Sequence, residues 1–77
     1  MEWEWIEESG SWRMTANGFN VRLYRSRGER PLWIMSALPV LQDEAVGRMP
    51  AERAQAAAIF MLSAALRKAA EQFAQRA

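Results

Sequence analysis

The stretch WRMTANGFNVRLYR, residues 12–25, decides the fold because an Asn-Gly pair separates two alternating segments. Apolar and polar residues alternate on both sides of that pair, which is the two-residue period of half-buried β-strands. Asn17 and Gly18 both tolerate a positive φ, so they favour a tight turn between antiparallel neighbours. The stretch therefore predicts a β-hairpin.

Two more segments, one on each side of the hairpin, are expected to be strands. Residues 2–8 alternate tryptophans with glutamates, and residues 32–37 form an apolar strand that Pro39 ends. Because the connections between these segments are short, consecutive strands should pair in antiparallel order. We predict a meander of three or four strands over residues 2–37.

The last third of the chain predicts a helix. After Pro50 no glycine or proline interrupts residues 50–76, and roughly 27 helical residues span ~40 Å. Pro50 suits the first helical position and Glu52 the positive end of the helix dipole. Residues 38–49 are expected to form a connection, with a helical turn around positions 43–46. The predicted fold class is α+β, order β-β-β-β-α: the antiparallel meander packs on one long C-terminal helix.

Length and composition indicate one compact domain over residues 1–77. A hydrophobic fraction of 51% and four tryptophans are unlike the composition of disordered chains. The absence of cysteine fits a reducing cytoplasm, no apolar run approaches the ~18 residues needed to cross a bilayer, and the acidic N-terminus does not resemble a signal peptide. We expect a cytoplasmic protein that does not bind membranes.

The residue types present argue against catalysis. Without histidine or cysteine, the usual acid–base group, the thiol nucleophile and the commonest transition-metal ligands are missing. The four glycines are isolated, so no phosphate-binding loop is formed. The glutamates near the N-terminus are best interpreted as an exposed, charged strand edge. We expect no enzyme, no metal, no cofactor and no small-molecule substrate.

The predicted helix has two apolar sides. One stripe at three-four spacing is expected to pack on the sheet; it consists of Ile59, Leu62, Leu66, Ala69 and Phe73. The first half of the helix is apolar on its other side as well, where a solvated helix should be polar. Those residues are Ala57, Phe60, Met61 and Ala64.

This second side has two interpretations. Small residues at Ala57 and Ala64 would let another helix approach closely, with Phe60 and Met61 as anchors of a partner or dimer interface. Alternatively, the 38–49 connection folds back over Phe60 and Met61 within the same chain. The sequence leaves both open.

The sheet face turned away from the helix is a second candidate surface. If Phe19, Val21, Leu23, Leu32 and Ile34 face the helix, the residues facing away are Arg22, Tyr24, Trp33 and Met35. The sequence does not fix the strand register, so either side of the fourth strand could face inward.

Three interpretations of this mixed face stay open. Aromatics with arginine favour a protein contact, or a stacking platform for single-stranded nucleic acid, or they merely cover an open sheet. Five arginines within 18 residues favour nucleic acid locally; they are Arg13, Arg22, Arg25, Arg27 and Arg30. The N-terminal glutamates and a net charge of only +1 oppose it.

Three of the four tryptophans lie in the first twelve residues. Alternation places Trp3 and Trp5 on one side of the first strand, and Trp12 joins them if the register permits. A domain without disulfides needs large buried side chains, so core packing is the first interpretation. Whether all three indoles fit under one helix stays open.

The segment PAERAQAAAIFMLSAAL, residues 50–66, after a run of strands, resembles the C-terminal part of a double-stranded-RNA-binding domain. That family also has a last helix with closely spaced alanines. The present chain lacks the N-terminal helix of the family and has Ala51-Glu52 in place of its lysine pair. The RNA-binding role is therefore not transferred to this chain.

Taken together, these patterns predict a protein-binding module. We expect a small regulator or inhibitor, of which a phage-type anti-defence protein is one instance. It would bind and block a larger protein as a homodimer that is joined through the first half of the helix. The alternative is a nucleic-acid-binding module that uses the Arg/aromatic sheet face.

Overall fold

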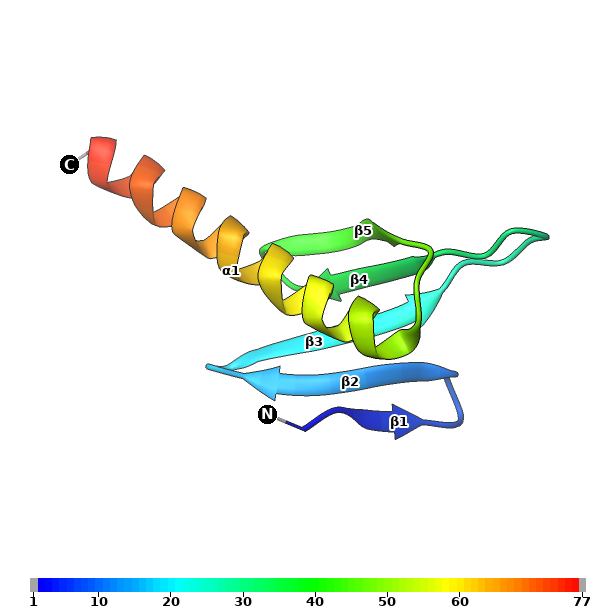
Figure 1. Cartoon of the computed structure of the whole chain (residues 1–77). Coiled ribbons are helices and arrows are strands. Elements are labelled where there is room, and N and C mark those ends of the chain that lie inside the picture. The colour runs from blue at the N-terminus through cyan, green and yellow to red at the C-terminus, as the bar shows by residue number, and fades with distance from the viewer. Residues whose placement is uncertain (1, 77) are drawn as a thin grey trace.

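The computed structural model describes residues 2–76, which form five strands and one helix. The strands pair in sequence order as an antiparallel meander, and the helix crosses one face of the sheet (Figure 1). This confirms the predicted α+β meander with its C-terminal helix, with one strand more than expected. The elements are β1 (Glu4–Ile6), β2 (Ser11–Ala16), β3 (Phe19–Arg25), β4 (Trp33–Ala37), β5 (Leu41–Gly47) and α1 (Ala51–Arg76).

The β2–β3 hairpin forms around the Asn-Gly pair, as predicted. Asn17 has a φ of 50° and Gly18 a φ of 82°, so both central residues adopt the left-handed conformation that a two-residue hairpin turn requires. Directly paired residues share a face of the sheet. The register places Met14 opposite Val21, and both are buried in the core.

The expected connection, residues 38–49, contains β5 rather than a helical turn. β5 pairs with β4 through two register shifts, and Asp43 within it has a φ of 49°. Such bulges add a residue to one strand and interrupt the alternation of its faces. As a result Leu41 and Val46, five positions apart, both pack against the core. The two-residue period that reveals a strand is therefore missing from this segment.

The sequence left open which side of β4 is buried. The candidate outward position of Trp33 and Met35 is wrong, because the two side chains are 6% and 0% exposed. The cause is the register: Met35 pairs with the fully buried Leu23, so both side chains lie on the helix side. The Trp33 indole donates its N–H to the Met49 carbonyl at 2.8 Å, which satisfies the polar end of a buried ring.

The N-terminal tryptophans are only partly covered. Trp3 and Trp12 are half-buried against the core, whereas Trp5 is 48% exposed and packs edge-on against Trp12 with ring centroids 5.1 Å apart. The reason is that α1 lies across β3, β4 and β5, while β1 lies at the edge of the sheet (Figure 1). The three indoles therefore do not all fit under α1.

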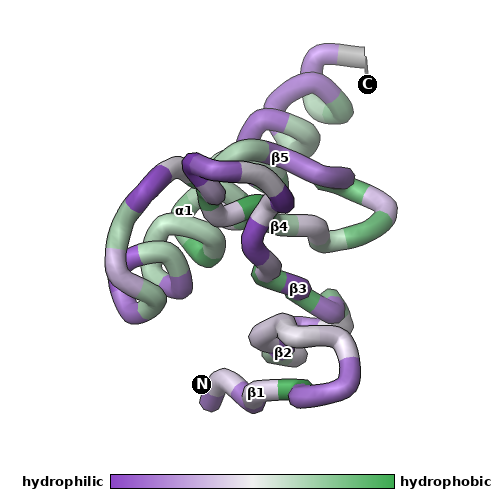
Figure 2. Tube along the Cα trace, turned by 90° about the vertical axis from the view of Figure 1, so that its right-hand side faces the viewer, coloured by the Kyte–Doolittle hydropathy of each residue, from purple (hydrophilic) through white to green (hydrophobic). Residues whose placement is uncertain are grey.

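Only the first half of α1 covers the sheet. Ala54, Ala58 and Leu62 are buried, Leu66 is half-buried, and Phe73 is 78% exposed. The prediction that the apolar stripe packs on the sheet as far as Phe73 was therefore wrong. The end of α1 extends past the strands, and hydrophobic segments recur along that projecting end (Figure 2).

Substitutions in β4 test which of its sides is buried. Met35→Ala should lower the free energy of unfolding by about 3 kcal/mol, because it leaves a cavity in the core, whereas Ile34→Ala on the other side should cost about 1 kcal/mol. Urea denaturation of both variants measures the two values. Equal losses, or a larger loss for Ile34→Ala, would contradict the orientation described here.

Candidate functional site

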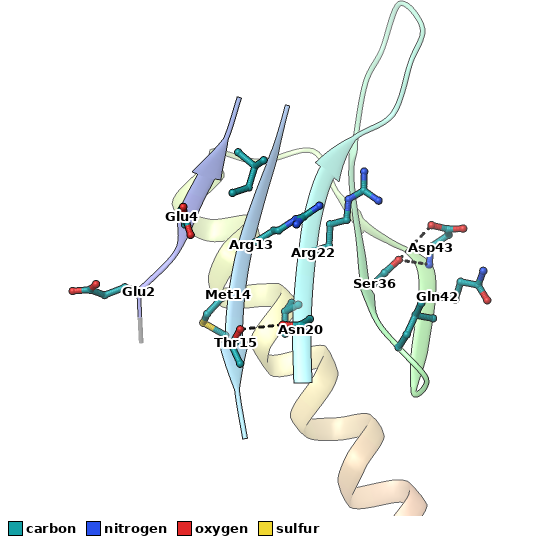
Figure 3. Close-up of a pocket in the computed structure, with 13 residues that line it drawn as sticks. Glu2, Glu4, Arg13, Met14, Thr15, Asn20, Arg22, Ser36, Gln42 and Asp43 are labelled. Atoms are coloured by element: carbon teal, nitrogen blue, oxygen red, sulfur yellow. Dashed lines mark hydrogen bonds between the residues drawn. The ribbon is translucent and has the colours of Figure 1, made fainter. Parts of the chain in front are cut away.

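The face of the sheet opposite α1 forms an open basin. Its volume is about 870 Å³, and it extends across the sheet from β1 to β5 (Figure 3). Most side chains that line it are polar. They include Glu2, Glu4, Arg13, Thr15, Asn20, Arg22, Ser36, Gln42 and Asp43.

Two arginines occupy the centre of this basin. Arg13 on β2 pairs directly with Arg22 on β3, and the outer neighbours in the same row are Glu4 and Ser36. Like charges directly opposite each other destabilise a sheet. The Arg22 guanidinium lies 5.1 Å from the centre of the Tyr24 ring.

Hydrogen bonds connect Tyr24, Ser36 and Asp43 at the β5 side of the basin. The Tyr24 hydroxyl donates to Asp43 Oδ1, and the Ser36 hydroxyl donates to the same oxygen at 3.3 Å. In return, the Asp43 backbone N–H donates to Ser36 Oγ at 2.9 Å. This bond and the positive φ of Asp43 direct its side chain towards Tyr24.

The pKa of Tyr24 is raised above its ordinary value of 10.0. Burial is the largest cause, and the hydrogen bond to Asp43 and the charge of Asp43 act in the same direction. The hydrogen bond with Ser36 and the charge of Arg22 lower it by less. Tyr24 is therefore a neutral phenol at physiological pH, so this cluster is better suited to hydrogen bonding than to proton transfer.

Part of the predicted sheet surface lies in this basin. Arg22 borders it, and Tyr24 shares the same sheet face, whereas Trp33 and Met35 belong to the core. Arg13 was not predicted as the partner of Arg22, although counting outward from the Asn17-Gly18 turn places the two opposite each other.

Ser36 and Asp43 were also missed as members of this surface. Their meeting depends on the irregular β4–β5 pairing. The alternation of apolar and polar residues does not indicate that Ser36 and Asp43 meet, because a bulge changes which residues of a strand share a face.

The second candidate surface is the outward side of α1. Phe60 is 71% exposed, Ala64 is exposed and Ala57 is half-buried. Met61 differs because it packs partly buried against the core. The 38–49 segment therefore leaves Phe60 uncovered. Of the four predicted interface residues, Met61 is the one that packs against the core.

Within residues 2–76, no cluster of three or more histidine, cysteine, aspartate or glutamate side chains could hold an ion. In the same residues, no helix is both long and apolar enough to pass through a bilayer. Comparisons of the chain with protein-family models, with curated proteins and with solved structures give no match.

The Tyr24–Asp43 hydrogen bond predicts the pH behaviour of Tyr24. Because Tyr24 is the only tyrosine in the chain, near-ultraviolet absorbance reports its ionisation alone. The wild type should ionise above pH 10.0, and Asp43→Asn should lower the pKa by removing a negative charge. Because the pKa of Tyr24 is raised in the folded protein, the neutral phenol contributes to the stability of the fold. This contribution is fully present below pH 10.0 and disappears as the pH rises through the raised pKa of the folded state. An unchanged titration in Asp43→Asn would contradict this geometry.

Proposed function

We propose that this protein is a non-enzymatic protein-binding module, and that the outward side of α1 around Phe60 is its contact surface. The observation that supports this proposal is the 71% exposure of Phe60. The opposite side of the helix is already buried on the sheet, so the Phe60 ring has no apolar partner in its own chain and stays in contact with water. Covering it against another protein recovers the free energy of apolar burial.

The neighbours of Phe60 suit a protein contact. Arg53 and Arg67 are exposed and lie two helical turns before and after Phe60, on the same side of the helix. Ala57 and Ala64 are small, so a partner can approach the backbone closely. Aromatic and arginine side chains are the types that supply most of the binding energy in protein interfaces. The matching partner surface would be an apolar pocket with acidic residues at its rim.

A module of this kind acts by occupying a surface of a larger protein. The chain has 77 residues and contains neither histidine nor cysteine, so it suits regulation or inhibition by blocking rather than by chemistry. We further propose that it works as a homodimer, which presents two copies of the Phe60 surface.

Affinity capture from lysate of the source cells tests this surface. We expect wild-type protein to retain a partner that Phe60→Glu does not retain, because the glutamate places a charge in an apolar contact. The matched control is Phe73→Glu, the same substitution at the other exposed phenylalanine of α1; it should still retain the partner. Equal retention by wild type and Phe60→Glu would contradict the proposed surface.

Nucleic-acid binding is the second candidate, favoured by the Arg13–Arg22 pair in the open basin. Two observations oppose it. Trp33 is in the core, so it is not available for stacking with bases. In addition, the acidic Glu4 and Asp43 border the basin at its two sides and repel a polyanion.

Oligonucleotide titrations discriminate between the two functions. Because acidic residues flank the arginines, we expect no saturable binding of single- or double-stranded oligonucleotides even at low salt. Fluorescence anisotropy measures this. Binding that weakens steeply with salt in the wild type, but is lost in Arg13→Gln, would establish phosphate contacts and favour the alternative.

A further inference from the structure

The apolar stripe of α1 continues where the sheet has ended. Leu62 is buried and Leu66 half-buried, and the same stripe then passes through Ala69 to Phe73, both of which are exposed. These positions are three or four residues apart and thus lie on one side of the helix. The projecting end of α1 therefore presents a hydrophobic side that the chain itself leaves open.

A hollow lies next to the point where α1 leaves the sheet. Its volume is about 170 Å³, and it is formed between α1 and the β2–β3 turn. Its lining is mainly apolar: Ala16, Asn17, Phe19, Ile59, Leu62, Ser63 and Leu66. A protein cavity of ~150 Å³ can hold a benzene ring. The hollow therefore has the size and the chemistry to receive one phenyl group.

We propose that two copies of this chain pair through the projecting ends of α1, antiparallel, with Phe73 of each copy in the hollow of the other. This inference specifies the homodimer of the proposed function and leaves the Phe60 surface free. In an antiparallel pair centred between Ala69 and Ala70, Phe73 lies opposite the partner copy's Leu66, because both positions are equally far along the helix from that centre. Leu66 lines the hollow.

The residues near the crossing suit close packing of two helices. Ala69 and Ala70 are small and exposed, so the helix axes can approach to ~8 Å. Lys68 and Glu71, also exposed, point away from the Leu66–Phe73 side at ~100° per residue and would remain in water. No charged side chain has to be buried at the centre of this interface.

A second copy is the occupant that these features favour. The projecting ring and the hollow that fits it occur on the same chain. A two-fold axis therefore places the ring of each copy in the hollow of the other, and the interface is complete with two copies. With 78% of Phe73 exposed, each ring contributes roughly 160 Å². Leu66, Ala69, Ala70 and the rim of the hollow add further apolar area to this contact.

Sedimentation at several hundred micromolar protein tests the pairing. The wild type should sediment with twice the 8.8 kDa mass of one chain, and Phe73→Glu should sediment as a monomer. Phe73 is 78% exposed in the single chain, so the variant should keep the circular dichroism spectrum of the wild type. Phe60→Glu is the matched control and should remain dimeric. A monomeric wild type would overturn the inference, as would a dimer that Phe60→Glu disrupts and Phe73→Glu does not.

Cross-linking provides a test that does not depend on removing Phe73. The chain has no cysteine, so a single introduced thiol can react only with its copy. Ala69→Cys, beside the proposed axis, should form a disulfide dimer on oxidation at least about tenfold faster than Glu71→Cys, which points to the other side. Equal rates would overturn the inference. Capture of a partner through Phe60 can succeed when both dimer tests fail, so the two proposals can fail separately.

Discussion

The difference in length between α1 and the sheet is the constraint on which the candidate surfaces depend. α1 has 26 residues and is ~39 Å long, whereas the longest strands have seven residues and span ~24 Å. Ala54 and Ala58 are fully buried, so the helix contacts the sheet closely at its beginning. Because the helix is straight, it cannot follow the sheet further and must project beyond it. Apolar residues in its second half then have no intramolecular partner.

The register of the hairpin determines the character of the other face. With Asn17 and Gly18 in the turn, Met14 and Val21 are buried together, and the same pairing necessarily places Arg13 beside Arg22 on the outer face. A shift by one residue would bury the arginines and expose the core. The repulsion between the two guanidinium groups is thus a consequence of satisfying the core. It is weakened by water and salt, and the Tyr24 ring offers Arg22 a favourable contact.

The sequence predicted those elements whose pattern is regular. The Asn-Gly turn identified the hairpin, and the uninterrupted run after Pro50 identified the helix. β5 was missed because the bulge at Asp43 removes its alternation. The orientation of β4 could not be predicted because Trp33, Ile34 and Met35 are all apolar, so the period of the strand favours neither side.

Exposure of side chains was harder to predict than their secondary structure. The stripe on α1 was correctly placed as one side of the helix, but its burial depends on where the strands end in space. Turns and register determine that position. Trp5 shows the same limitation. It pairs with Trp12 on the side of the sheet that carries the core, yet it is 48% exposed because α1 does not reach β1.

The positions of Phe60 and Phe73 on α1 constrain any assembly. The two residues are 13 positions apart, which at ~100° per residue places them about 140° apart around the helix axis. A single flat contact cannot cover both rings. If Phe73 is buried between two copies of the chain, as we propose, the two Phe60 rings lie on the outer sides of the paired helices. Two molecules of a protein partner could then bind, one to each copy, without competing with the dimer contact.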